Sequence, residues 1–333
     1  MLLTYIGYPA LLLASLALIL FACELFTNGV EWTGKKLDLS DGAVGSILAA
    51  VGTALPETSI PIIALIAGKE NSDIAVGAIA GAPFMLSTLT LFVAGAAYFW
   101  FSRRGKRGKG LNVDPKVLSR DLSFFLVVYT VAFITTFIPG HSIRLAIAAG
   151  LALSYGFYIY LTLSQEGVKG GHIEELHLSR VFRVQTHSGS ILLQVVISLT
   201  LIVTGAHFFV VAVEHVSGML GVPALLLSLI ITPVATELPE KMNSVLWIRE
   251  GKDTLAIGNI TGAMVFQSSF PVAIGVAFTP WALNGPTMAS ALIAITSAAV
   301  CLVTLKLKKT LPPASLMLGG VFYAAFMAYL LTM

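Results

Sequence analysis

Ten apolar segments, each about long enough to cross a lipid bilayer as a helix, constrain the fold of this chain more than any other feature. A membrane-spanning helix needs about 20 predominantly apolar residues. Charged residues make up only 11% of the 333 residues, against about 25% in soluble domains. The segments lie near residues 8–32, 42–67, 73–101, 121–138, 142–163, 189–216, 222–248, 253–280, 286–306 and 313–332. We therefore predict an all-α membrane protein with ten transmembrane helices.

The basic residues predict the orientation of these helices. Of the 20 Lys and Arg residues, 17 fall on one set of loops, and the opposite loops hold only Lys69 and Arg144. The positive-inside rule places the first set in the cytoplasm, so we expect both termini outside. The confinement of basic charge to loops indicates topology rather than a nucleic-acid surface.

Neither the start of the chain nor its cysteines changes this prediction. The first apolar run lacks the basic start and small-residue cleavage site of a secretory signal, so it is kept as a spanning helix. Cys23 and Cys301 both lie inside apolar segments, where they resemble small core residues. They predict no disulfide framework and no thiolate metal site.

The two halves of the chain are related in sequence. An offset of 183 aligns Glu57 with Glu240, and an offset of 181 aligns residues 73–82 with residues 254–263. Each half has five predicted helices, an odd number, so the second half must cross the membrane in the reverse direction. Such inverted repeats are typical of secondary transporters that bind ions near the bilayer midplane.

This relation predicts the organisation of the whole chain. The first inverted repeat covers residues 1–163, and the second covers residues 189–333. A cytoplasmic linker, residues 164–188, joins them. Its three histidines and three acids could bind a metal, but a solvated connector is the favoured interpretation.

The second and seventh apolar segments contain similar motifs, Gly-Thr-Ala-Leu-Pro-Glu at 52–57 and Ala-Thr-Glu-Leu-Pro-Glu at 235–240. A proline inside a helix frees the carbonyl oxygen four residues before it. Threonine and glutamate stand four residues apart, so both lie on one helix face beside that oxygen. Oxygen ligands of this kind suit hard cations such as Na⁺ and Ca²⁺. The candidate cation ligands are Thr53, Glu57, Thr236 and Glu240.

At these motifs the sequence resembles the cation/Ca²⁺ exchanger superfamily, especially its prokaryotic Na⁺/Ca²⁺ exchanger branch, over nearly the whole chain. That family has a Gly-Thr-Ser-Leu-Pro-Glu-like motif in its second and seventh helices. The resemblance implies that the four candidate ligands form a central Ca²⁺ site, to which Thr53 and Thr236 contribute mainly backbone carbonyl oxygens. It also implies transport by alternating access to that site.

The third and eighth helices diverge from the family pattern, Gly-Asn-x-x-Gly-Ser-Asn-x-Phe followed by Asn or Asp. The third helix, at residues 77–86, lacks the first Asn, the Ser and the closing Asn, and ends the motif with Leu86. The eighth keeps Asn259 but has Ala263 and Gln267 at the later positions. Asn259 and Gln267 are further candidate cation ligands. Because the family's flanking Na⁺ sites use the oxygens lost here, the coupling ion, Na⁺ or H⁺, is left open.

Glu237 occurs only in the second repeat. Lys241 follows it by four residues, the favourable order for an ion pair on a helix. At the corresponding places the first repeat has Ala54 and Thr58. Glu237 could therefore form an ion pair with Lys241 or act as a third acid of the cation site.

Glu24 and His207 occupy matched positions in the first and sixth helices, 183 residues apart. The resemblance implies that these two helices slide across the binding core. An acid and an imidazole at matched depth could relay protons or act in gating. The alternative is a pair of interhelical hydrogen bonds, and this is the favoured interpretation.

These observations predict a secondary antiporter that exchanges Ca²⁺ for Na⁺ or H⁺. A Na⁺/H⁺ exchanger is the alternative, because the altered third and eighth helices offer fewer oxygens than Ca²⁺ prefers. An intramembrane enzyme is disfavoured, since no His-Glu-x-x-His, Gly-x-Ser-x-Gly or paired Asp-rich motif is present. No cofactor is expected besides the transported ions, and the expected partners are inorganic cations and the lipid bilayer. We expect a multi-pass protein of a prokaryotic inner membrane, with the oligomeric state left open.

Overall fold

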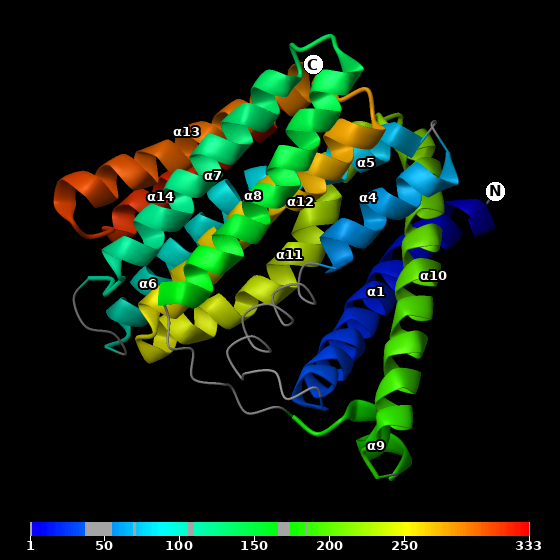
Figure 1. Ribbon diagram of the computed structural model, residues 1–333. Coiled ribbons are helices and arrows are strands. Elements are labelled where there is room, and N and C mark those ends of the chain that lie inside the picture. The colour runs from blue at the N-terminus through cyan, green and yellow to red at the C-terminus, as the bar shows by residue number, and fades with distance from the viewer. Residues whose placement is uncertain are drawn as a thin grey trace. The chain divides into compact units, whose positions relative to one another are not determined.

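The computed structural model describes residues 2–36, 55–68, 71–105, 110–165, 174–183 and 185–332. Within these ranges the chain forms helices and no strand (Figure 1). Eight of the helices are long and apolar enough to cross a membrane, and Glu57–Ala67 and Ala224–Val234 are shorter apolar stretches. The protein is therefore an all-helical, multi-pass membrane protein. The first part of the predicted second span, residues 42–54, lies outside the described ranges.

The helices group into two compact units that do not coincide with the two predicted repeats. The first unit comprises Met1–Ala75 and Gly156–Ala224, and the second comprises Val76–Tyr155 and Leu225–Met333. Each unit thus combines segments from both halves of the sequence. The count of ten spans in two inverted repeats stays a prediction.

In the first unit, α1 (Leu2–Lys36) and α10 (Ser188–Leu220) lie side by side (Figure 1). Gly29 faces Val195 and Gly205 faces Ile19; a Cβ atom added to these glycines would lie 2.9 and 2.8 Å from the respective side chains. The two helices therefore run antiparallel, and small residues permit their close approach. Helix α4 (Leu55–Ala67) contacts both of them.

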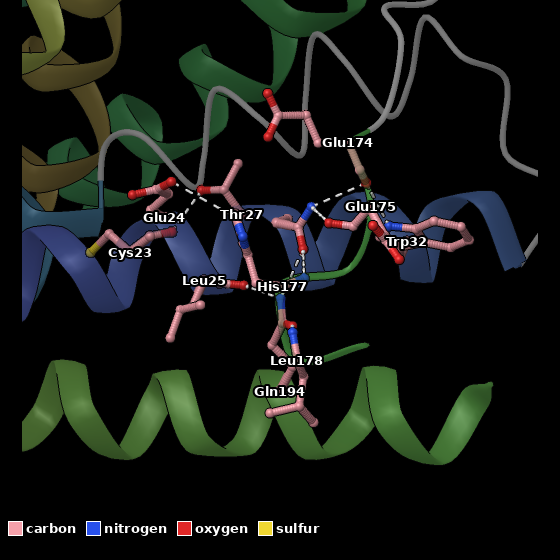
Figure 2. Close-up of polar contacts among 11 residues, drawn as sticks. Cys23, Glu24, Leu25, Thr27, Trp32, Glu174, Glu175, His177, Leu178 and Gln194 are labelled. Carbon is pink, nitrogen blue, oxygen red and sulfur yellow. Dashed lines mark hydrogen bonds and ion pairs between the residues drawn. The ribbon is translucent and has the colours of Figure 1, made fainter. Parts of the chain in front are cut away.

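Part of the predicted linker also belongs to this unit. The short helix α9 (His177–Phe182) and the residues before it bind α1 and α10 (Figure 2). The Asn28 side chain accepts a hydrogen bond from His177 N at 3.1 Å, and Trp32 Nε1 donates to Glu174 O at 2.9 Å. The predicted solvated connector is therefore docked on the helices over Glu174–Leu178, because α1 and α10 offer side chains that satisfy its backbone groups.

The predicted third span is one continuous helix, but its hydrogen-bonding pattern changes along its length. Helix α5 (Ser72–Met85) passes through one π-helical turn, η3 (Leu86–Thr90), into α6 (Leu91–Arg103). This turn follows Pro83, which cannot donate a backbone hydrogen bond. Single π turns inside α-helices occur frequently at functional sites.

In the second unit, α12 (Asp253–Phe278) and α13 (Gly285–Lys308) pack against α7 (Pro115–Thr135). Helix α14 (Pro313–Leu330) packs against α6 and η3. Trp281 is buried and donates from Nε1 to the carbonyl oxygen of Ala132 at 3.0 Å, which joins the end of α12 to α7. Helix α7 begins earlier than predicted because Asp114 caps its N-terminus and Pro115 occupies its first turn. The remaining bounds are α8 His141–Gln165 and α11 Ala224–Glu250.

Candidate cation-binding site

Glu57, in the first unit, lies in the first turn of α4. Its side chain is only 4% exposed, and Thr58 and Ser59 beside it are also buried. Pro56 in the same turn is tolerated because first-turn amides have no partner within the helix. The helix N-terminus carries a partial positive charge, which favours a carboxylate there. Thr53 lies outside the described residues.

The second motif lies in the middle of α11, in the second unit. The helix is continuous from Ala224 to Glu250, so Pro239 does not break it. Thr236 is fully buried, and its hydroxyl donates to the carbonyl oxygen of Thr232 at 2.9 Å. The side chains of Glu240 and Lys241 lie outside the described part of the chain, so the central acid pair and the Glu237–Lys241 ion pair both stay predictions.

Two of the predicted residues do come together in the second unit. Gln267 Nε2, on α12, donates a hydrogen bond to Glu237 Oε1, on α11, at 3.2 Å. Both side chains are at most 2% exposed. Gln267 Oε1 is buried and has no hydrogen-bond partner in the part of the chain that the structure describes. A buried acceptor left without a donor costs about 1–3 kcal/mol.

Asn259, a third predicted ligand from the same helix, has a different partner. Its Nδ2 donates to Ser244 Oγ, near the end of α11, at 3.3 Å. Eight residues separate Asn259 from Gln267, which corresponds to about 12 Å along an α-helix. The structure therefore places Asn259 apart from the Glu237–Gln267 pair.

Four further buried hydroxyl groups lie in η3 and α12, and the sequence analysis did not identify them. Ser87 and Thr88 in η3 both donate to the carbonyl oxygen of Phe84, and Ser268 and Ser269 in α12 both donate to that of Val265. The offset of 181 relates the two sets residue by residue, since 87 + 181 = 268 and 84 + 181 = 265. The internal repeat was therefore the sequence feature that could have identified these four hydroxyl groups. The related segments of the two halves thus form the same local hydrogen bonds.

Glu24 and His207 are not brought together by any hydrogen bond or ion pair among the described residues. Glu24 Oε1 lies 3.7 Å from His177 Nε2, which belongs to α9 (Figure 2). His207 is exposed on α10, and its ring contacts the ring of Phe208. Their role in gating or in a proton relay stays a prediction.

A further buried acid, Asp121, is held by hydrogen bonds within the protein and has a structural role. Its Oδ2 accepts a hydrogen bond from Thr261 Oγ1 at 2.7 Å, and its Oδ1 accepts one from Arg120 Nε at 3.1 Å. The bond from Thr261 joins α12 to α7, and the bond from Arg120 lies within α7. Sequence reasoning passed over this residue because it lies at the very start of the predicted fourth span.

The chemistry available in these positions is that of oxygen donors. Among the described residues, no group of three or more His, Cys, Asp and Glu side chains could hold a metal ion. The described residues offer the buried carboxylates of Glu57 and Glu237, together with buried hydroxyl groups and the buried amide of Gln267. Such donors suit hard cations that are bound and released.

Fold and site together define a polytopic membrane protein that carries acids inside its helices, a feature typical of ion transporters. Residues 7–164 and 190–333 match the family described as sodium/calcium exchanger protein. The chain therefore belongs to this family, which is one of membrane transporters rather than of enzymes.

Three relatives illustrate the similarity. CaxA from Alkalimonas amylolytica is 24% identical over 275 residues, which cover 82% of this chain and 81% of that protein. The sodium/calcium exchanger MaX1 from Methanosarcina acetivorans is 22% identical over 303 residues, which cover 81% of this chain and 83% of MaX1. The crystal structure of the H⁺/Ca²⁺ exchanger CAX superposes with a TM-score of 0.72 at 17% identity, over 97% of this chain and 82% of that chain. This last likeness shows a shared fold.

Proposed function

We propose that this protein is a secondary antiporter that moves Ca²⁺ across the membrane in exchange for Na⁺ or H⁺. Family membership supports the transporter class. The observation that carries the proposal is the burial of Glu57 next to Pro56 at the start of the apolar helix α4, in a motif that the other half repeats at Pro239 and Glu240. A carboxylate at bilayer depth costs about 2.5–3.5 kcal/mol or more, so it indicates a function that requires it.

The proposed mechanism follows from charge balance. Glu57 and Glu240 together carry two negative charges, which one Ca²⁺ neutralises. Thr53 and Thr236 would supply backbone oxygens to the same ion. When Ca²⁺ leaves, two Na⁺ ions or two protons must replace it to avoid two uncompensated charges in the membrane. Exposing the site alternately to the two sides of the membrane then gives antiport rather than free conduction.

The two possible coupling ions both have precedents among the relatives. MaX1 is named a sodium/calcium exchanger, and CAX is named an H⁺/Ca²⁺ exchanger. Exchange of Na⁺ for H⁺ without Ca²⁺ is the second candidate, and the full burial of Leu86 in η3 favours it, because that side chain offers no oxygen to a divalent ion.

Proteoliposomes loaded with either a Na⁺ or a pH gradient, and assayed for ⁴⁵Ca²⁺ uptake, test the proposal. We expect uptake with at least one gradient, and background uptake for Glu57→Gln and for Glu240→Gln. Glu214→Gln is the matched control, since Glu214 is an exposed glutamate on α10. Near-normal uptake by both site variants would exclude the proposed ligands. Na⁺/H⁺ exchange without any Ca²⁺ uptake would favour the second candidate.

A further inference from the structure

The offset that relates the third span to the eighth changes by one residue at the π turn η3. Up to the turn, an offset of 181 aligns similar residues: Ser87 with Ser268, Thr88 with Ser269 and Leu89 with Phe270. After the turn, an offset of 180 does so: Gly95 with Gly275, Ala97 with Ala277 and Tyr98 with Phe278. The third span therefore holds one residue more than the eighth, and Thr90 lies where the offset changes.

The π turn explains how the chain accommodates this extra residue. A π turn closes with a hydrogen bond between residues i and i+5, one residue further than in an α-helix. In an uninterrupted α-helix, one extra residue would rotate everything after it by about 100°. Helix α12, which carries the related segment, is α-helical throughout, from Asp253 to Phe278. The sequence and the structure thus place the insertion at the same turn.

Two neighbouring helices fit around the backbone of η3. Ser297 Oγ, on α13, donates a hydrogen bond to Ser87 O at 2.5 Å. Thr88 O lies so close to Gly319, on α14, that a Cβ atom added to this glycine would overlap it. Thr90 is 1% exposed, and its hydroxyl has no hydrogen-bond partner among the described residues. The turn is therefore held through its carbonyl groups, and not through the hydroxyl of Thr90.

Different helices hold the two parts of the third span. On α5, Gly81 lies against Leu229 O of α11, with no room for a Cβ atom. On α6, a Cβ atom added to Gly95 would lie 3.2 Å from Pro313 O of α14. Pro83 and η3 lie between these two contacts, and both prolines and π turns are usual sites of helix bending. The span can therefore bend at η3 while each part keeps its own partner.

We propose that η3 is a one-residue insertion that makes the third span a jointed helix, in which α5 moves with α11 while α6 stays with α14. Helix α11 carries the motif of Pro239 and Glu240, so bending at η3 displaces that motif relative to α14. The eighth span lacks the insertion, so the two repeats bend differently. Only the use of this bending in transport rests on the proposed function.

Deletion of Thr90 from the full-length protein tests the insertion. We expect this variant to be monodisperse in detergent, with a melting temperature close to that of the parent, because both flanking helices keep their packing faces. Deletion of Phe270, which the offset of 181 relates to Leu89, is the matched control on α12. It should abolish folding, since it rotates the rest of that helix by about 100°. Loss of folded protein in both variants would overturn the proposal.

Hydrogen–deuterium exchange of the purified parent protein tests the joint without any transported ion. We expect amides in residues 86–95 to exchange about tenfold faster than those in the related residues 267–275, because exchange reports local opening. Deletion of Thr90 should remove this difference. Equal exchange of the two segments in the parent would contradict a joint at η3.

Uptake of ⁴⁵Ca²⁺ into proteoliposomes tests whether transport uses the joint. For the variant without Thr90 we expect a lower maximal rate and an unchanged KM, because η3 moves helices and binds no ion. A raised KM would place η3 in the ion site, and an unchanged rate would show that transport does not need the bend; either result overturns the proposal. Absence of uptake by the parent would instead refute the proposed function, and the folding and exchange comparisons would still decide whether η3 is a joint.

Discussion

Asp121 and Thr261 show how a single pair of side chains can fix the position of one spanning helix on another. Asp121 is 1% exposed, and each of its carboxylate oxygens accepts a hydrogen bond. Burying a carboxylate strongly destabilises a fold unless such partners offset its lost hydration. The threonine hydroxyl is therefore part of what makes an acid tolerable at this place.

Thr261→Val tests this role, because it removes the hydroxyl and keeps the shape of the side chain. We expect the free energy of unfolding in detergent to fall by about 1–3 kcal/mol, the cost of depriving a buried group of its partner. Thr296→Val is the control. That hydroxyl is exposed and, among the described residues, bonds to Leu292 O of its own helix, so a change within about 0.5 kcal/mol is expected. Equal effects of the two substitutions would contradict the assigned role.

At the scale of elements, helix α5 contacts α11 through two glycines, which have no side chains. A Cβ atom at Gly77 would meet the backbone of Leu225, and one at Gly81 would meet the carbonyl oxygen of Leu229 and lie 2.7 Å from Pro233 Cγ. The two glycines are four residues apart, so they lie on one face of the helix. Close contact between these helices therefore depends on the absence of Cβ atoms. Gly258, related to Gly77 by the offset of 181, has nothing within 4 Å of its added Cβ among the described residues.

Replacing Gly81 by Ala is expected to lower the melting temperature of the detergent-solubilised protein, because the new methyl group overlaps backbone atoms of α11. Gly150→Ala on α8 is the matched substitution, since nothing lies within 4 Å of its Cβ position. Alanine exceeds glycine in helix propensity by about 1 kcal/mol, so Gly150→Ala should be neutral or stabilising. If the two variants shift the melting temperature by the same amount and in the same direction, the α5–α11 contact is loose enough to accept a methyl group.

At the scale of the whole molecule, the directions of packed helices agree with alternating crossings of a membrane. In the first unit, α1 and α10 run antiparallel, with Tyr8 stacked on His215 near one end and Gly29 facing Val195 near the other. In the second unit, α7 and α12 run parallel, as their contacts from Asp121–Thr261 to Ala132–Trp281 show. These are the relative directions that the predicted first and sixth spans, and the fourth and eighth, would have.

The absolute orientation rests on the distribution of basic residues, and cysteine labelling can test it. In a background in which Cys23 and Cys301 are replaced, we expect an impermeant reagent to label His141→Cys in intact cells. Lys106→Cys should react only after the cells are permeabilised, because the positive-inside rule places that basic loop in the cytoplasm. The reverse pattern would show that both termini face the cytoplasm.

The sequence by itself determined the helical membrane fold, the approximate ends of the described spans and the buried acids at 57 and 237. Hydropathy and proline position are local properties, which a sequence displays directly. Only the tertiary structure decided which side chains meet, because Gln267 reaches Glu237 across 30 residues, Thr261 reaches Asp121 across 140 and Gln194 reaches Asn28 across 166. It also decided that the linker docks on α1 and α10 and that the compact units combine both halves of the chain. Such choices depend on how whole helix faces pack, which no local pattern records.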